Sequence, residues 1–199
     1  IRTAPSRVVP PEGALSAAGA LGYPVVLKGL APGLVHRSDV GAVILGVSTP
    51  LGVVAAVKAL QERLGRVGLG LPEVLVQRQI AGGVEAMVGV VTDPDLGPLV
   101  VAGLGGREVE LTRDVAFRLT PVTDRDAAEM IDGLRMRPLL DGYRAAPAGD
   151  RPALLELIGR VSALADAIPE IRELDLNPVK ILVPGEGAVV VDARIRVEG

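Results

Sequence analysis

The sequence has no cysteine, no tryptophan and a single histidine, His36, and its other aromatic residues are Tyr23, Tyr143 and Phe117. Without cysteine, the chain cannot form disulfides, zinc–thiolate centres, iron–sulfur clusters or a cysteine nucleophile. One imidazole also excludes a histidine-rich metal site. Three aromatic rings offer few platforms for stacking bases, and a net charge of −3 does not attract a polyanion, so we expect no nucleic-acid binding.

Long uninterrupted apolar runs are missing as well, although the mean hydropathy is +0.41. The longest uncharged run, 40–57, is broken by Ser48, Thr49, Pro50 and Gly52, which predict the end of a strand followed by a helix cap. We therefore expect no membrane-spanning helix and no membrane partner, and no signal peptide is visible. Because the sequence opens without methionine, we expect a cytoplasmic segment of a longer protein.

The pattern of glycine, proline and apolar residues predicts two α+β lobes, 1–80 and 81–199, separated near Gly82 and Gly83. In the first lobe we expect helices and strands at 13–21, 25–30, 43–47, 50–66 and 73–80. In the second we expect strands near 84–92, 98–104, 108–113 and 116–120, helices near 124–135 and 150–166, and a final hairpin of 171–182 and 187–197. Clefts between two lobes are common binding sites for small ligands.

Lys28 is a charged residue in the otherwise apolar strand predicted over 25–30. A lysine is rarely buried without a partner, because removing its ammonium group from water costs several kcal/mol. Two interpretations follow from this position. The lysine either directs a compact positive charge at a phosphate oxygen in a cleft, or it is a paired structural lysine whose stem packs on the strand.

The final hairpin brings two oxygen-bearing side chains together. A turn centred between Gly185 and Glu186 pairs Asp192 with Val179 and places Asp192 diagonal to Asn177, on one face of the hairpin. An amide and a carboxylate at that spacing can share a Mg²⁺ ion and leave coordination positions for water and phosphate oxygens. The alternative is that both residues belong to the solvated face of a strand.

Two further residues have the chemistry of a phosphate or nucleotide site. His36 lies in a glycine-bearing loop, 31–42, and a neutral imidazole can attack a phosphoryl group, with Arg37 and Ser38 beside it to offset the incoming charge. Glu85, in the first strand after the two glycines, can bind a ribose hydroxyl, a metal ion or the phosphate-binding lysine. The alternatives are an exposed loop histidine and a carboxylate on the solvent face of a strand.

Taken in order, these motifs resemble the ATP-grasp domain of the NDP-forming (ADP-forming) acyl-CoA synthetases, relatives of the succinyl-CoA synthetase beta subunit. The matching stretches follow the family's order and cover nearly the whole chain from Leu21: GYPVVLK (22–28), HRSDVG (36–41), VLVQ (74–77), GGVE (82–85), GP (97–98), GLGG (103–106), PLLDGYR (138–144), ELDLNP (173–178) and VDAR (191–194). The resemblance implies an ATP-grasp fold, two α+β lobes with the nucleotide cleft between them.

The resemblance also implies a role for each candidate residue. Lys28 resembles the phosphate-binding lysine, and Glu85 the acidic residue that closes the nucleotide cleft. The segment that meets adenine through backbone groups corresponds to Gln77, Arg78, Gln79 and Ile80. The Mg²⁺ ligands correspond to Asn177 and Asp192. His36 resembles the histidine that relays a phosphoryl group between a distant acyl site and ADP or ATP.

The activity that the resemblance implies is the reversible conversion of acyl-CoA, ADP and phosphate into a carboxylate, CoA and ATP. The CoA-binding part of such enzymes, with its own histidine, is absent from this chain. We therefore expect CoA-binding or CoA-ligase domains of the same parent protein or of a partner subunit as partners, with CoA and the carboxylic acid bound there. One departure is Gly41-Ala42 where the family carries two glycines, which stiffens the loop after His36.

An alternative function stays open at this point. The same domain occurs in bacterial protein lysine acetyltransferases, where a synthetase-like region is fused to an acetyltransferase and acts as an inactive regulatory sensor. The presence of the five candidate site residues favours the synthetase; they are Lys28, His36, Glu85, Asn177 and Asp192.

Overall fold

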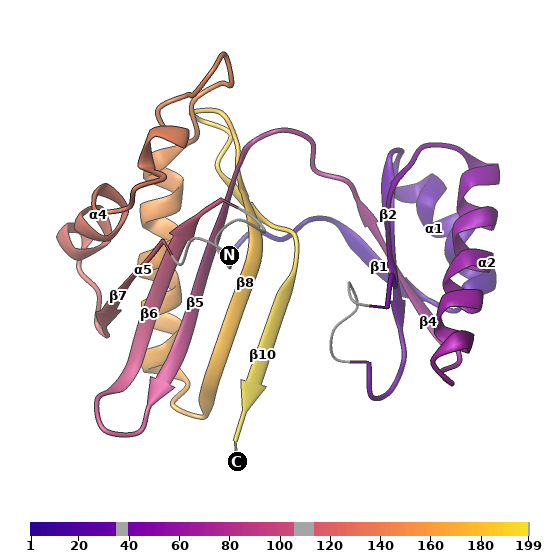
Figure 1. Ribbon diagram of the computed structural model, residues 1–199, viewed down its shortest axis with the longest axis horizontal. Helices are drawn as coiled ribbons and strands as arrows, with labels where there is room; N and C mark the ends of the chain where they lie inside the picture. The colour runs from indigo at the N-terminus through magenta and orange to yellow at the C-terminus, as the bar shows by residue number, and fades with distance from the viewer. Residues whose placement is uncertain (35–39, 106–113, 199) are drawn as a thin grey trace. The chain divides into compact units, whose positions relative to one another are not determined.

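The computed structural model describes residues 1–34, 40–105 and 114–198. The chain divides into two compact units: an N-terminal unit, Ala4–Ile80, and a C-terminal unit, Ala81–Gly199 with Ile1–Thr3. Each unit has its own sheet with helices packed on it, so the predicted α+β class is confirmed (Figure 1). The first residues belong with the C-terminal unit because the amide of Val190 donates to the carbonyl oxygen of Arg2 at 2.9 Å.

The N-terminal unit is a four-stranded antiparallel sheet of order β1-β4-β2-β3 with its helices packed on one face. Its elements are β1 (Ser6–Val9), η1 (Pro11–Gly13), α1 (Ala14–Leu21), β2 (Val25–Leu30), β3 (Val43–Val47), α2 (Pro50–Arg66) and β4 (Glu73–Arg78). Helix α2 begins where the sequence predicts, because the Thr49 hydroxyl accepts the amide hydrogen of Gly52 and Pro50 occupies the first turn.

The C-terminal unit is a larger sheet of order β10-β8-β5-β6-β7, with β9 also paired to β8. Its elements are β5 (Val84–Asp93), β6 (Gly97–Leu104), β7 (Val115–Leu119), α4 (Asp124–Asp132), η2 (Arg137–Leu139), α5 (Arg151–Ala167), β8 (Ile171–Ile181), β9 (Ala188–Val190) and β10 (Ala193–Val197). Figure 1 shows α4 and α5 beside this sheet. A capping box between Thr123 and Asp126 starts α4.

In each sheet the residues that pack in the core with the helices identify one face, and their neighbours along the strand lie on the other face. In the N-terminal unit, Leu27 and Val76 are fully buried in the core with the helices, so their neighbours Lys28 and Gln77 lie on the opposite face. In the C-terminal unit Ala86 is buried against the helices in the same way. The candidate polar residues of both units therefore lie on the sheet faces that point away from the helices.

Two expectations about the elements need correction, and a third, the strand expected at 108–113, lies wholly outside the described residues. The second arm of the last hairpin is not continuous, since β9 ends at Val190 and β10 begins at Ala193. Helix α4 ends at Asp132, earlier than expected, and Gly133 is its C-cap residue. No helix in the described part of the chain is long and apolar enough to cross a membrane.

Candidate functional site

In the N-terminal unit, Lys28 and Gln77 are two buried polar residues on neighbouring strands. Lys28 lies across from Leu75 in the β2–β4 ladder and Gln77 lies across from Val26, so the two residues are diagonal neighbours on one face. Their exposed fractions are 4% and 5%. Sequence reasoning treated them as separate features, and the antiparallel register brings them together. An ammonium group and an amide side by side can donate hydrogen bonds to the oxygen atoms of an anion.

The segment that follows β4 is tied down by hydrogen bonds within its own unit. The amide of Arg78 donates to the Pro5 carbonyl oxygen at 2.8 Å, and the amide of Gln79 donates to the Pro24 carbonyl oxygen at 3.0 Å. The Gln79 side chain accepts the amide hydrogen of Gly46 at 2.7 Å. Two amides of the expected adenine-binding segment, those of Arg78 and Gln79, are therefore already used within the unit.

In the C-terminal unit, Glu85 is paired with a lysine that the sequence analysis did not single out. The Nζ of Lys180 lies 2.8 Å from Oε1 of Glu85. The two residues are direct partners in the ladder of β5 and β8. A signal was present in the sequence, since Lys180 stands three positions after Asn177 in the stretch Asn-Pro-Val-Lys.

The hairpin register differs from the expected one. Asn177 lies directly across from Asp192, and the backbone amide of Asn177 donates a hydrogen bond to the backbone carbonyl oxygen of Asp192 at 3.1 Å. The expected pairing of Asp192 with Val179 is wrong, because Val179 pairs with Val190. The turn sits one residue earlier than assumed, with the Leu182 amide bonded to the Gly187 carbonyl oxygen. The two candidate metal ligands are therefore direct cross-strand neighbours and not diagonal ones.

A bulge in β8 corrects a second expectation, that Asn177 and Val179 share a face. Along β5, Ala86 pairs with Val179 and Val88 pairs with Leu176, so β8 carries one residue more than β5 between these pairs. Leu176 and Val179 are both buried in the core as a result. Asn177 follows the buried Leu176 and therefore lies on the face that points away from the helices. Lys180 follows the buried Val179 and lies on that same face.

Asp150 fixes the position of the hairpin turn, and the sequence analysis missed it. One carboxylate oxygen accepts the amide hydrogen of Ala153 at 3.2 Å and so caps α5. The other oxygen accepts the amide hydrogens of Gly185 at 2.8 Å and Gly187 at 3.0 Å. Burial of this carboxyl acts to raise its pKa, but the hydrogen bonds from Ala153, Gly187 and Gly185 outweigh burial, so the pKa is lowered. The carboxylate therefore anchors the tip of the hairpin that holds Asn177 and Asp192.

The histidine of the expected relay, His36, lies outside the described residues. The loop that contains it is described again from Val40, and the carbonyl oxygen of Gly41 accepts a hydrogen bond from Nη1 of Arg63 at 2.7 Å. The candidates that the structure does describe form two sets, one in each unit. Lys28 and the segment after Gln77 belong to the N-terminal unit, and the hairpin residues and Glu85 belong to the C-terminal unit.

The donor set of the hairpin suits a hard divalent cation. An amide oxygen of Asn177 and a carboxylate of Asp192 are oxygen ligands of the kind that Mg²⁺ takes, and Mg²⁺ usually keeps several waters or substrate phosphates. Within the described ranges, no group of three or more histidine, cysteine, aspartate or glutamate residues could hold a metal on its own. A cation at this hairpin would therefore draw its remaining ligands from water and a bound phosphate.

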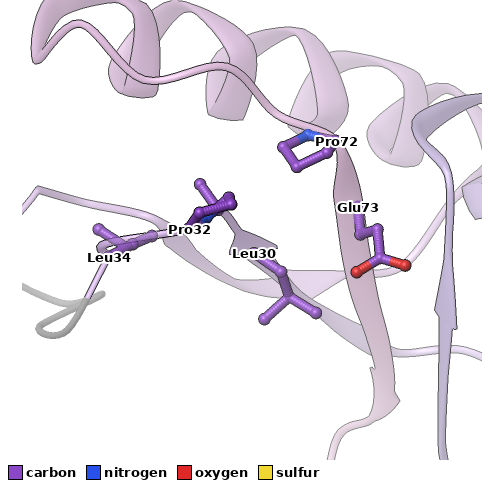
Figure 2. A pocket seen from close by; sticks show the side chains of 6 residues that line it. Leu30, Pro32, Leu34, Pro72 and Glu73 are labelled. Atoms are coloured by element: carbon purple, nitrogen blue, oxygen red, sulfur yellow. The ribbon is translucent and has the colours of Figure 1, made fainter.

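A pocket of about 420 Å³ lies within the N-terminal unit. Figure 2 shows its lining, in which Leu30 of β2 and Glu73 of β4 stand on neighbouring strands beside Pro32 and Pro72. The wall is mostly apolar, with one carboxylate. Neither Lys28 nor Gln77 lines this pocket, so it is not the expected phosphate site.

Comparisons with known sequences give consistent results along the whole chain. A family model described as ATP-grasp domain matches residues 1–197. The beta subunit of ADP-forming acetate–CoA ligase II from Pyrococcus furiosus is 38% identical over 189 residues, covering 94% of this chain and 80% of that subunit. ADP-forming acetate–CoA ligase I from Archaeoglobus fulgidus is 42% identical over 183 residues, covering 89% of this chain but only 26% of that longer protein.

Solved structures of an enzyme from the same family as these relatives also match this chain. Acetyl-coenzyme A synthetase 1 of Ca. Korarchaeum cryptofilum, in complex with coenzyme A and Ca-AMPCP, has a TM-score of 0.94 and 36% identity, and the match covers 100% of this chain and 87% of that one. A second structure of that enzyme, with coenzyme A and Mg-AMPPCP, has a TM-score of 0.85 and 36% identity, with coverage of 100% and 86%. Its phosphohistidine segment is described as pointing towards the nucleotide binding site.

Proposed function

The chain belongs to the ATP-grasp domain family of the ADP-forming acetyl- and acyl-CoA synthetases, and from this premise we propose that it binds ADP and ATP with Mg²⁺ and transfers a phosphoryl group through His36. The parent reaction would be acyl-CoA, ADP and phosphate to carboxylate, CoA and ATP, in either direction. The observation that carries the proposal is the direct pairing of Asn177 with Asp192, which sets two magnesium-type ligands side by side. The related structure that holds Mg-AMPPCP supports it.

We assign the phosphate and adenine contacts to the N-terminal unit. The buried ammonium of Lys28 would bind phosphate oxygens, because a charge with little access to water interacts more strongly with a counter-charge. Gln77 would add an amide donor beside it. The segment of Arg78, Gln79 and Ile80 would hold the purine through backbone groups. Its hydrogen bonds to Pro5 and Pro24 stabilise the segment before the nucleotide arrives.

We assign the metal and the closing carboxylate to the C-terminal unit. Asn177 and Asp192 would hold Mg²⁺, which would offset the negative charge that develops in phosphoryl transfer. The chain's part is to supply the two oxygen ligands at a fixed separation. Asp150 maintains that separation by anchoring the turn between β8 and β9. Glu85 would accept hydrogen bonds from the nucleotide.

We assign the covalent step to His36. An imidazole nitrogen attacks the γ-phosphorus of ATP, the bond from this phosphorus to the β–γ bridging oxygen breaks, and ADP leaves as a phosphoramidate forms. The reverse step returns the phosphoryl group to ADP. In the matched enzyme of Ca. Korarchaeum cryptofilum, a phosphohistidine segment is described both towards the nucleotide site and in a phosphorylated form.

The rest of the reaction requires a partner. One matched relative is itself a beta subunit, and the related structures contain coenzyme A. We propose that CoA and the carboxylic acid bind to CoA-binding domains of the same parent protein or of a companion subunit. The acyl group is not determined by the residues of this chain.

Calorimetric titration with ATP, with and without Mg²⁺, tests the nucleotide site, and incubation with [γ-³²P]ATP and Mg²⁺ tests the transfer. We expect binding that depends on Mg²⁺ and is lost in EDTA, followed by acid-labile, base-stable label on the chain. If ATP binds normally but no label ever appears with the partner domains present, the regulatory-module alternative becomes the better one. If ATP does not bind at all, the proposed function is wrong.

A further inference from the structure

The ion pair of Glu85 and Lys180 is partly shielded from water. The side chain of Lys180 is 19% exposed and that of Glu85 is 39% exposed, with 2.8 Å between Nζ and Oε1. By comparison, the side chains of Arg160 and Glu156, an ion pair on α5, are 58% and 63% exposed. A charge with restricted access to water is screened less and costs more to leave unpaired.

The backbone fixes this pair before any ligand arrives. Glu85 and Lys180 are direct partners of adjacent strands, and Val84 pairs with Ile181 beside them. Gly83 approaches β8 so closely that a Cβ atom there would lie 2.8 Å from the carbonyl oxygen of Ile181. The start of β5 is therefore held against this part of β8, which keeps the backbones of Glu85 and Lys180 side by side and their side chains within reach of each other.

The bulge explains why Lys180 has access to the proposed site. In a regular strand, residues three apart point to opposite faces. Because β8 carries an extra residue between Leu176 and Val179, Lys180 lies on the face away from the helices, as Asn177 does. The same face presents Glu85 from β5. The ion pair therefore belongs to the surface that carries the proposed metal ligands.

We propose that Lys180 is a positioning residue for the nucleotide site: it holds the carboxylate of Glu85 in one orientation and offsets its charge, so that Glu85 accepts a hydrogen bond from the nucleotide without repelling its phosphates. This inference rests on the proposed function and adds to it a residue that the family resemblance did not assign. Replacing Lys180 with an apolar residue takes this counter-charge away from the partly buried carboxylate of Glu85. Such a group repels an anionic ligand and moves among several rotamers.

The test is a double-mutant cycle on MgADP affinity, measured by calorimetry on the full chain. We expect Lys180→Met to weaken MgADP binding by about tenfold, and Lys180→Arg to stay within about twofold of the wild type, because arginine restores the charge and the hydrogen bond. In a chain that already carries Glu85→Gln, Lys180→Met should change the affinity by less than about twofold. The thermal midpoint of each variant separates loss of binding from loss of folding.

A matched control is the pair on α5. Glu156→Gln and Arg160→Met remove an ion pair of similar length, 2.7 Å, and should leave MgADP affinity unchanged. The positioning role is overturned if Lys180→Met binds MgADP as the wild type does, or if its effect is just as large in the Glu85→Gln chain, which would mean that Lys180 acts independently of Glu85. Wild-type protein that binds no MgADP would instead overturn the proposed function, and the role of Lys180 with it.

Discussion

Asn177 lies directly across from Asp192, and the backbone amide of Asn177 donates a hydrogen bond to the backbone carbonyl oxygen of Asp192 at 3.1 Å. The pairing joins two residues that are 15 positions apart in the sequence through a turn anchored by Asp150. Both residues are half-buried, and neither is part of the hydrophobic core. Substitutions of Asn177 or Asp192 should therefore have little effect on core packing. The proposed metal site can be tested directly by such substitutions.

The first prediction concerns the metal. Asp192→Ala should weaken Mg²⁺-dependent ATP binding by more than about tenfold, because it removes the charged member of the proposed ligand pair while the fold is retained. Calorimetry with and without Mg²⁺ measures this effect. Glu186→Ala, at the exposed tip of the same hairpin, is the matched control and should bind normally. An unchanged MgATP affinity in Asp192→Ala would rule out the hairpin as the metal site.

The second prediction concerns Lys28. Lys28→Met keeps the aliphatic stem in its buried position and removes the charge, so we expect the ATP affinity to fall by about tenfold or more while the fold is retained. Urea unfolding and calorimetry are the two measurements. Lys58→Met on the exposed surface of α2 should change neither quantity. A large loss of stability with unchanged ATP affinity would mean that Lys28 is a structural lysine.

The third prediction concerns His36. With [γ-³²P]ATP, Mg²⁺ and the CoA-binding partner present, His36→Ala should lose the acid-labile label and acyl-CoA formation while its ATP affinity changes by less than about twofold, because the imidazole transfers the phosphoryl group and does not anchor the nucleotide. Filter assays for the label and calorimetry for ATP separate the two effects. Wild-type rates of acyl-CoA synthesis in His36→Ala would disprove the relay.

The fourth prediction concerns Asp150. Its pKa in the folded protein is lowered, so the carboxylate stabilises the fold at any pH above the unfolded value of about 3.9, and this contribution is lost as the pH falls through the folded pKa. Asp150→Ala should cost about 2 kcal/mol at pH 7, since it removes a helix cap and leaves amides of Gly185 and Gly187 without an acceptor.

Urea unfolding between pH 3 and pH 7 tests the role of Asp150. The stability difference between the wild type and Asp150→Ala should shrink towards the acid end of that range. Asp166→Ala, at the exposed C-terminal end of the same helix, should cost nothing, because an acidic group there opposes the helix dipole. A stability difference that does not change with pH would show that the ionised form of Asp150 is not what stabilises the turn.

Much of the fold follows from local patterns. Helix α2 could be placed from Thr49 and Pro50, because a cap and a first-turn proline act on the residues next to them. The strand that contains Lys28 could be placed from its run of β-branched and apolar neighbours. Family membership was also predictable, since the motifs are short stretches whose order along the chain is visible in the sequence, and the comparisons confirm it.

Register and strand faces were not predictable in the same way. The turn of the last hairpin could be drawn at two positions one residue apart, and the contact with Asp150, far from the turn in the sequence, supports one of them. The bulge between Leu176 and Val179 depends on how β8 fits against β5. A single extra residue reverses every later side chain in a strand, so a small error in pairing changes which residues meet.

The sequence by itself determined the composition class, the alternation of helices and strands, and the chemical types present: one imidazole, a lysine in an apolar strand, and an amide and a carboxylate near the final turn. The tertiary structure decided which of these groups are neighbours. It paired Asn177 with Asp192, placed Lys180 beside Glu85, and joined Asp150 to the hairpin tip. The physical reason is that local propensities depend on adjacent residues, whereas side-chain proximity depends on long-range packing and register, which no short stretch of sequence specifies.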